Sequence, residues 1–159
     1  MARRGGRAHA RATGGDERSD ARERALILLY EADTKGVSPR DAAAAQVVEP
    51  DSLTRVLVEG VEDHREQLDG AIARHARGWT LERMPLIDLT VMRIAAFELL
   101  GRPDVPVAVV LDEAVELAKR FSTDDSGRFV NGVLSALVGE LRPSAPLPRD
   151  AAPHDRTEG

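Results

Sequence analysis

Apolar side chains recur every three or four residues through most of the chain, which is the spacing of one face of an α-helix. In the first half, this pattern predicts a helix over 20–35 and a long helix over 51–76. Between them, Ser38 followed by Pro39 is typical of the start of a short helix, which Pro50 is expected to end. The first half is therefore predicted to be helical, with short turns.

The second half continues the same spacing. A turn over 80–83 is expected to lead into a helix over 85–101, and the stripe of apolar residues over 107–121 predicts another. A last helix should follow, capped by Asp125 or Ser126. Since Ala, Leu and Val dominate and aromatic residues are few, the sequence predicts an all-α protein, folded as a compact bundle.

The two ends of the chain lack this pattern. Residues 1–19 combine arginine and glycine without periodic apolar residues, so we expect a disordered basic arm. Residues 142–159 hold four prolines and are expected to form a disordered tail. The helical domain should span 20–141, with an N-terminal half over 20–78 and a C-terminal half over 79–141.

Charge divides the chain unevenly. Residues 1–24 hold seven arginines against four acidic residues, whereas the remainder holds 15 basic against 23 acidic residues. The net charge of the whole chain is −5. Basic segments attract nucleic acid through its phosphates, although basic tails are common in proteins that bind none. The sequence thus predicts an acidic body joined to a basic arm.

The residues give no sign of catalysis. The chain has no cysteine, which removes disulfides, thiolate metal sites and cysteine nucleophiles. His64 and His75 lie about 16 Å apart along one predicted helix, too far to share a metal ion. We therefore expect a protein that is not an enzyme and holds no metal or cofactor.

No segment has the roughly 20 consecutive apolar residues of a membrane span, and the N-terminus lacks the apolar core of a signal peptide. We expect a soluble, cytoplasmic protein.

One long segment has a more specific pattern. Residues 104–134 read DVPVAVVLDEAVELAKRFSTDDSGRFVNGVL, which resembles the C-terminal half of the NusB family. There, D-V-P is followed by an acidic E-A-V-E-L-A-K run and then by D-S-x-x-F-V-N-G-V-L. Residues 79–83, 88–99 and 21–30 resemble the middle and the first helix of the same family, so the resemblance covers about 20–141.

The resemblance implies a bundle of about seven helices in two helical subdomains, which we expect to divide near Gly78. It also implies transcription antitermination: binding of boxA-type RNA in ribosomal RNA transcripts together with the small-subunit ribosomal protein that acts as NusE. RNA polymerase, in the antitermination complex, is thereby kept from premature termination. A homodimeric interaction module with an occluded RNA face is the alternative. We do not expect one of the related RNA cytosine methyltransferases, which need a further domain with a catalytic cysteine, because this sequence has no cysteine.

The resemblance also implies site residues. An RNA surface is expected at Arg18, Arg22, Tyr30, Asp125 and Phe129, where a carboxylate can accept from base amino groups and an exposed aromatic ring can stack. Core packing is the other interpretation of Phe129.

Carboxylates of Glu82 and Asp88 are expected to face the basic ribosomal protein, or else to stabilise helix N-termini. Where many relatives have an Arg/Lys cluster before the first helix, this chain has Ser19 and Asp20. Its extra arginines lie earlier, at Arg3, Arg4, Arg7 and Arg11.

Overall fold

The computed structural model describes residues 15–143, and all of their regular secondary structure is helical, which confirms the all-α prediction. There are six α-helices and one short 3-10 helix, η1, in this part of the chain. In order they are α1 (Gly15–Lys35), α2 (Pro39–Ala44), α3 (Ser52–His75), η1 (Leu81–Arg83), α4 (Leu86–Gly101), α5 (Val107–Phe121) and α6 (Asp124–Leu141).

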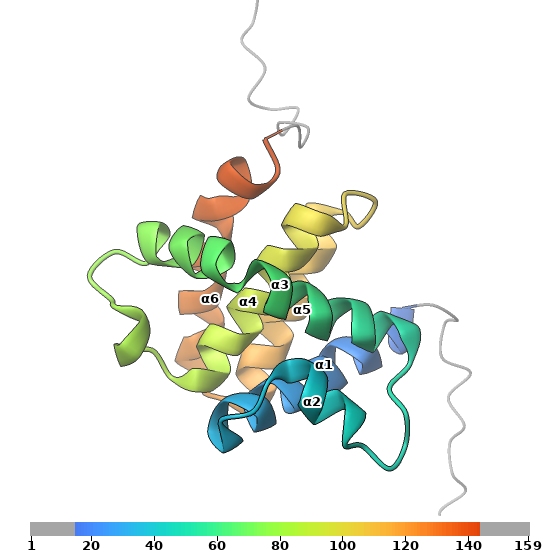
Figure 1. Cartoon of the computed structure of the whole chain (residues 1–159). Helices are drawn as coiled ribbons and strands as arrows, with labels where there is room; N and C mark the ends of the chain where they lie inside the picture. The colour runs from blue at the N-terminus through green and yellow to red at the C-terminus, as the bar shows by residue number, and fades with distance from the viewer. Residues whose placement is uncertain (1–14, 144–159) are drawn as a thin grey trace, which may run out of the picture.

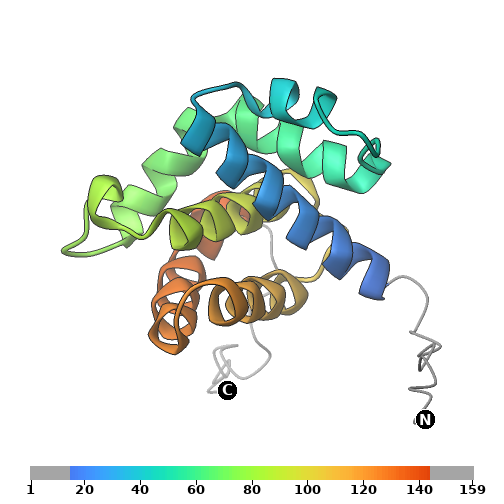
Figure 2. The same ribbon diagram turned by 90° about the horizontal axis from the view of Figure 1, so that it is seen from below.

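Helix α4 is the centre of the bundle. It packs against α1 and α3 on one side and against α5 and α6 on the other, as Figures 1 and 2 show. Every residue from Asp88 to Leu99 is buried, as expected for a helix that has neighbours on all sides. The remaining helices therefore owe much of their stability to the apolar face that each turns toward α4.

Helices α3 and α4 approach closely at Gly60. A Cβ atom at this position would lie 2.2 Å from the ring of Phe97, so only glycine leaves room for the aromatic side chain. This contact explains why a glycine stands in the middle of α3, where it lowers the stability of an isolated helix.

A buried arginine joins three helices nearby. Arg93 of α4 donates to both carboxylate oxygens of Asp69 on α3, at 2.7 and 2.9 Å. It also donates to Asp33 of α1 at 3.3 Å. Since two carboxylates surround its guanidinium, this buried charge is compensated by the fold itself.

The predicted arm is wrong in its last five residues, because α1 begins at Gly15 and not at Asp20. Asp16 and Glu17 stand in its first turn, where negative charge is favourable beside the unpaired N–H groups of a helix N-terminus. Residues 1–14, with the remainder of the arm, lie outside the described part of the chain.

The predicted tail is wrong at its first residue. Arg142 is 8% exposed and donates to backbone carbonyls of Glu98 and Arg102 at 2.8 Å, of Leu99 at 2.9 Å, and of Val105. A helix C-terminus leaves its last carbonyls without partners in the helix, and this guanidinium donates to carbonyls at and just after the end of α4. Those of Glu98 and Arg102 also accept from the backbone N–H groups of Arg102 and Val105. The rest of the tail, residues 144–159, lies outside the described part of the chain.

Side-chain caps begin several helices. The predicted cap Ser38 is confirmed, since it accepts from the backbone N–H of Asp41 at 3.1 Å. At α6, the prediction of Asp125 or Ser126 is wrong: Thr123 is the cap and accepts from the backbone N–H of Ser126 at 3.1 Å. The cap of α6 thus lies two or three residues before the predicted one.

Asp51 caps α3 with its carboxylate, to which the backbone N–H of Thr54 donates at 2.7 Å. This hydrogen bond lowers the pKa of Asp51 below its ordinary value of 3.8. Because the pKa is lower in the folded chain than in the unfolded chain, the charged cap stabilises the fold at neutral pH. That stabilisation is lost as the pH falls below 3.8 and through the folded pKa.

We expect Asp51→Ala to lower the free energy of unfolding by about 1 kcal/mol at neutral pH. Urea denaturation at neutral pH and below the folded pKa of Asp51 should show the difference from the unsubstituted chain shrinking in acid. Asp51→Asn is the matched control, since it keeps a capping oxygen without the charge and should lose less. A loss in Asp51→Ala that does not depend on pH would contradict the role of the ionised cap.

Candidate nucleic-acid interface

The outward side of α1 carries two of the predicted RNA-binding residues. Arg18 is exposed at the end of the first turn of the helix, and Tyr30 is exposed toward its other end, near exposed Ile27. At about 1.5 Å per residue, Arg18 and Tyr30 lie about 18 Å apart along the helix axis. They can therefore contact the same ligand only if it is an extended one.

Arg22, the third predicted RNA-binding residue on α1, is buried. Its side chain is 2% exposed and makes two hydrogen bonds to Glu98 of α4, Nε to Oε2 at 2.8 Å and Nη2 to Oε1 at 2.9 Å. Glu98 is 1% exposed and also accepts from Arg102 at 3.0 Å. In this structure Arg22 links α1 to α4 and does not face solvent, contrary to the surface position that we predicted.

The helical period of α1 explains the burial of Arg22. Ala25, Leu26 and Leu29 lie three, four and seven residues further along and are all buried, so they share its face of the helix. The other signal is Glu98, an acid within an apolar run of α4. A lone charge in such a run needs a buried partner, and Arg22 supplies it.

The start of α6 brings three side chains together. Asp125 is exposed in the first turn, and Phe129 is half-buried one turn later, against the apolar core. The ring of Phe129 meets Trp79 edge to face, with centroids 6.0 Å apart and planes at 62°. The ring of Phe129 therefore packs against the core, as one interpretation expected, and is only partly covered, so that its contact with RNA stays a prediction.

A hollow of about 180 Å³ lies beside this aromatic pair. Trp79, Met84, Pro85 and Phe129 give it apolar walls, and Asp125 contributes a carboxylate. An apolar hollow with an acceptor beside it suits a flat ring that carries a hydrogen-bond donor. Among the predicted residues, Asp88, Asp125 and Phe129 all line this one hollow.

Asp88 does not present its charge at the surface, which corrects the prediction of a partner contact there. It is buried at the start of α4, and its Oδ2 accepts from the hydroxyl of Ser126 at 2.9 Å. Its Oδ1 has no hydrogen-bond partner in the described part of the chain. Asp88 therefore fixes the start of α6 against α4, whereas Glu82 on η1 is exposed as expected.

Trp79 is the residue that the sequence analysis missed. It is 51% exposed and follows Gly78, whose φ of 79° is a left-handed conformation that favours glycine. This turn ends α3 and holds the indole against Phe129. An exposed tryptophan directly after a helix-ending glycine was the available signal, because large aromatic side chains at the surface are often binding residues.

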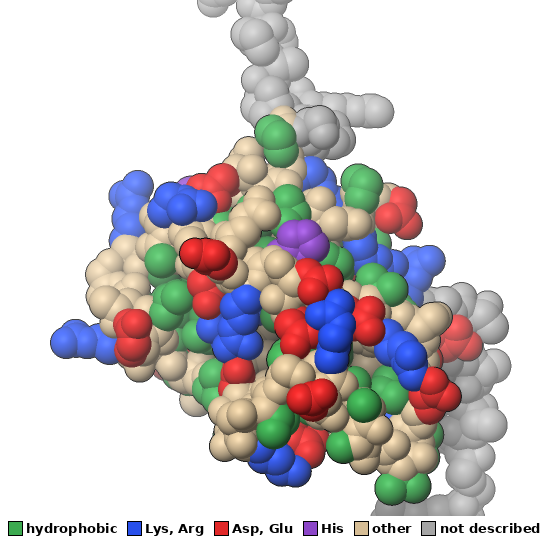
Figure 3. All heavy atoms as spheres, in the orientation of Figure 1, with side chains coloured by type: hydrophobic (Ala, Val, Ile, Leu, Met, Phe, Trp, Pro, Cys, Tyr) green, Lys and Arg blue, Asp and Glu red, His purple; other side chains and the backbone are tan. Residues whose placement is uncertain are grey.

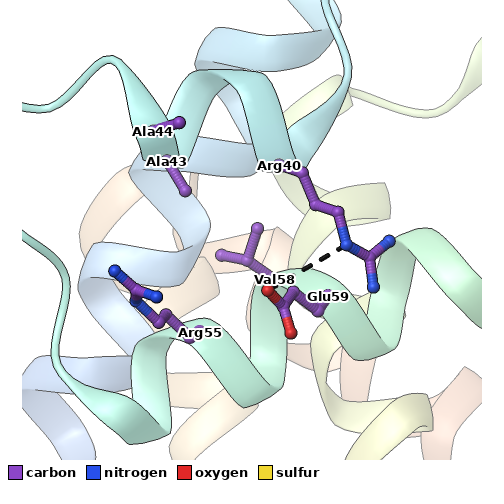
Figure 4. Close-up of a pocket in the computed structure, with 6 residues that line it drawn as sticks. All are labelled: Arg40, Ala43, Ala44, Arg55, Val58 and Glu59. Carbon is purple, nitrogen blue, oxygen red and sulfur yellow. Dashed lines mark ion pairs between the residues drawn. The ribbon is translucent and has the colours of Figure 1, made fainter.

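The surface formed by α2 and α3 differs from the apolar hollow, because it carries paired acidic and basic side chains. Arg40 donates to both carboxylate oxygens of Asp63, at 2.8 and 3.0 Å, and also pairs with Glu62 and, at 4.0 Å, with Glu59. Figure 4 shows Arg40 and Glu59 beside the small hollow between the two helices. The guanidinium of Arg40 lowers the pKa of Asp63, so this acid stays ionised at neutral pH.

The face seen in Figure 3 carries acidic and basic side chains interspersed. A surface with mixed charges offers a polyanion little net attraction. The arginine of the α2–α3 cluster is therefore best explained as a link between two helices, and this face is not part of the candidate interface.

Neither a metal-binding cluster nor a membrane-spanning helix is found within residues 15–143. No three His, Cys, Asp or Glu side chains of this part gather closely enough to hold a metal ion. None of its helices combines the length and the apolar character that crossing a bilayer requires.

Comparison with known proteins points to one family. The model of the NusB family matches residues 19–138 of this chain. A transcription antitermination protein NusB from Saccharopolyspora erythraea is 49% identical over 128 residues, which are 77% of this chain and 86% of that protein.

Solved structures agree with this match. NusB of T. maritima has a TM-score of 0.72 and 29% identity, over 79% of this chain and 93% of that one. NusB of Aquifex aeolicus, solved in solution, has a TM-score of 0.65 and 27% identity, over 85% and 97%. A crystal structure of the antitermination factors NusB and NusE in complex with dsRNA gives 0.68 and 25%, over 79% and 98%.

Proposed function

This chain belongs to the NusB family, and from that premise we propose that it is a transcription antitermination factor. It binds boxA-type RNA of ribosomal RNA transcripts together with the ribosomal protein that acts as NusE, and so prevents premature termination. The observation that carries the proposal is the 49% identity to an antitermination protein over 77% of the chain. The structure of NusB with NusE and dsRNA supports RNA and NusE as the partners.

The aromatic edge at the start of α6 supports RNA binding physically. Trp79 and Phe129 offer ring surfaces on which a base can stack, and Asp125 can accept a hydrogen bond from a base amino group. Single-stranded loops and ends expose bases in this way, whereas duplex RNA does not. The bound element is accordingly single-stranded where it meets this edge.

Glu82 is the residue that we assign to the protein partner. It is exposed on η1, where a basic face of the ribosomal protein could meet it. Asp88 contributes to RNA binding indirectly, because its hydrogen bond to Ser126 fixes the start of α6, and with it the aromatic edge, against α4.

The proposed factor works by binding and not by catalysis, in the cytoplasm, where the transcript is made. We further propose that the helices form two subdomains that divide near Gly78, so that the turn carrying Trp79 lies at their boundary. The geometry of the aromatic edge then depends on how the two halves pack. Its affinity for RNA responds to a partner protein that contacts both halves.

The test is a titration of boxA-type and scrambled RNA, with and without the ribosomal partner. We expect tight binding only for the boxA-type RNA and only with the partner present. Equal affinity for both RNAs in every condition would defeat the proposed function.

Arg18→Ala is expected to weaken RNA binding and to reduce the slope of log affinity against log salt by about 1, because one phosphate contact is lost. Fluorescence anisotropy at several salt concentrations measures this slope. Arg40→Ala is the control, since it removes an exposed arginine from the mixed-charge surface and should leave the slope unchanged. Equal slopes for both variants and the unsubstituted chain would remove Arg18 from the interface.

A homodimer that occludes the RNA surface is the second candidate. Ile27 and Tyr30 are exposed apolar side chains on the outward side of α1, and such residues can mediate self-association. Light scattering separates the candidates: a stable dimer that RNA cannot dissociate would favour the second.

A further inference from the structure

We propose that the groove between the end of α3 and α6 is a track for the backbone of single-stranded RNA that continues beyond the aromatic edge. The inference rests on the proposed function and extends its RNA surface to residues that the family resemblance did not indicate. The groove has a volume of about 560 Å³. Its basic and aromatic lining residues are Arg74, His75, Arg77, Trp79, Arg128 and Phe129.

The lining has one sign of charge. It includes three arginines and no aspartate or glutamate among the described residues that form it. Residues 25–159 as a whole hold 15 basic against 23 acidic residues, so the groove is a local exception on an acidic body. A cationic groove of this kind follows the phosphates of single-stranded nucleic acid.

Two of the three arginines are free to contact a ligand. Arg77 is exposed, and no hydrogen bond or ion pair to it is found within residues 15–143. Arg128 is 86% exposed, and its one contact, to Asp125 at 3.1 Å, is a surface pair that RNA can replace at little cost. Arg74 is instead held by Glu140, at 2.8 Å to each carboxylate oxygen.

Glu140 neutralises Arg74 but lies outside the groove lining. The hydrogen bond from Arg74 lowers the pKa of Glu140, which keeps this acid ionised and the pair intact at neutral pH. Arg74 is thus a fixed wall of the groove. The excess positive charge comes from Arg77 and Arg128.

The floor of the groove is open because its residues are small. Gly132 and Ala136 lie one turn apart on α6, and a Cβ atom at Gly132 would meet no atom within 4 Å. Trp79 and Phe129 line both this groove and the hollow beside Asp125. A strand could therefore pass from base stacking at the aromatic pair directly into the cationic groove.

RNA is favoured over an acidic protein segment by this continuity. Base stacking on aromatic rings is sequence-tolerant, since every base has a π face, and it accompanies cationic grooves in proteins that bind single strands. An acidic peptide would use the arginines but would gain little from the paired rings.

Gly132→Leu tests the track, because it places a bulky side chain on the floor at a position where a Cβ atom meets no atom within 4 Å, and it replaces glycine with a better helix former. Gly139→Leu is the matched control: it lies on the same helix, its Cβ also meets no atom within 4 Å, and it is outside the groove. Two RNAs are used with the partner present, boxA alone and boxA extended by unpaired nucleotides. Circular dichroism verifies that both variants are folded.

We expect the unsubstituted chain to bind the extended RNA more tightly than boxA alone. Gly132→Leu should remove most of this difference and so weaken binding of the extended RNA about tenfold, the effect of one lost stacking or groove contact. Arg77→Ala should reduce the salt slope for the extended RNA by about 1, with boxA alone little affected. Gly139→Leu should behave as the unsubstituted chain.

The track is overturned if Gly132→Leu retains the full advantage of the extended RNA, or if Arg77→Ala weakens binding of the ribosomal partner and not of RNA. These outcomes differ from failure of the proposed function, in which the unsubstituted chain itself does not distinguish boxA from scrambled RNA.

Discussion

Glu98→Ala is expected to lower the free energy of unfolding by about 3–5 kcal/mol, because it removes the carboxylate that accepts both hydrogen bonds from the buried guanidinium of Arg22 and leaves only Glu113, 4.0 Å away. Both side chains are almost completely buried, and the two hydrogen bonds between them join α1 to the central helix α4. Arg102 also loses a hydrogen bond at 3.0 Å. Urea denaturation followed by circular dichroism measures the change, and a small chain of this kind should unfold in one transition.

Two controls distinguish a buried charge from an ordinary ion pair. Glu31→Ala removes the exposed pair with Lys35, four residues away on α1, and should cost no more than about 0.5 kcal/mol. Replacing Arg22 and Glu98 together by leucine should recover most of the lost stability, since it removes both charges. A Glu98→Ala variant as stable as Glu31→Ala would contradict the burial of this pair.

The same pair changes how an Arg22 variant should be interpreted. Loss of RNA binding in Arg22→Ala would follow from loss of the folded state and would not demonstrate a contact with RNA. Arg18, four residues earlier and exposed, is the position at which α1 can be tested for that contact.

Arg142→Ala is expected to lower the free energy of unfolding by about 3 kcal/mol, because four backbone carbonyls each lose a hydrogen bond and only those of Glu98 and Arg102 keep a backbone donor. Ending the chain after Leu141 should have a similar effect, whereas ending it after Pro143 should leave stability unchanged. Urea denaturation of the three variants gives the comparison.

Arg142→Lys should restore only part of the stability. An ammonium group has three donors on one nitrogen and cannot reproduce the planar fork of a guanidinium. If the chain that ends after Leu141 proves as stable as the chain that ends after Pro143, then Arg142 does not hold the end of α4.

Sequence periodicity predicted the helices best where apolar residues were regular. The helix expected over 107–121 is α5 with the same bounds, and the one expected over 51–76 is α3 within one residue at each end. Helix starts were less well predicted. Helices α1 and α6 begin before their first periodic apolar residues, with polar side chains at their starts: Asp16 and Glu17 in α1, and the cap Thr123 in α6. Apolar periodicity does not detect such polar first turns.

Charged residues in the core were the harder part to predict. Arg22 and Glu98 lie 76 positions apart, and Arg142 lies 43 positions from the carbonyl of Leu99 that it contacts. The sequence places Arg22 and Glu98 on apolar helix faces but does not show that they pair with each other, since each partner becomes adjacent only through the packing around α4. The same holds for Asp88, whose hydrogen bond to Ser126 crosses 38 positions.

The candidate site was predicted in outline. Asp125 and Phe129 lie at the start of one helix, and the structure places them beside one hollow. The groove along α6 could not be predicted from the sequence, because Arg77 and Arg128 belong to different helices and the small residues that open it have no signal of their own.

Trp79 is the only tryptophan of the chain, and it lies between the hollow and the groove, so its fluorescence reports on both sites. Its indole ring is about half exposed and packs on Phe129, so a base that stacks there alters the polarity around it and its emission. Ligand binding at this edge can thus be followed by intrinsic fluorescence on the unlabelled chain, without an added dye that could itself occupy the hollow.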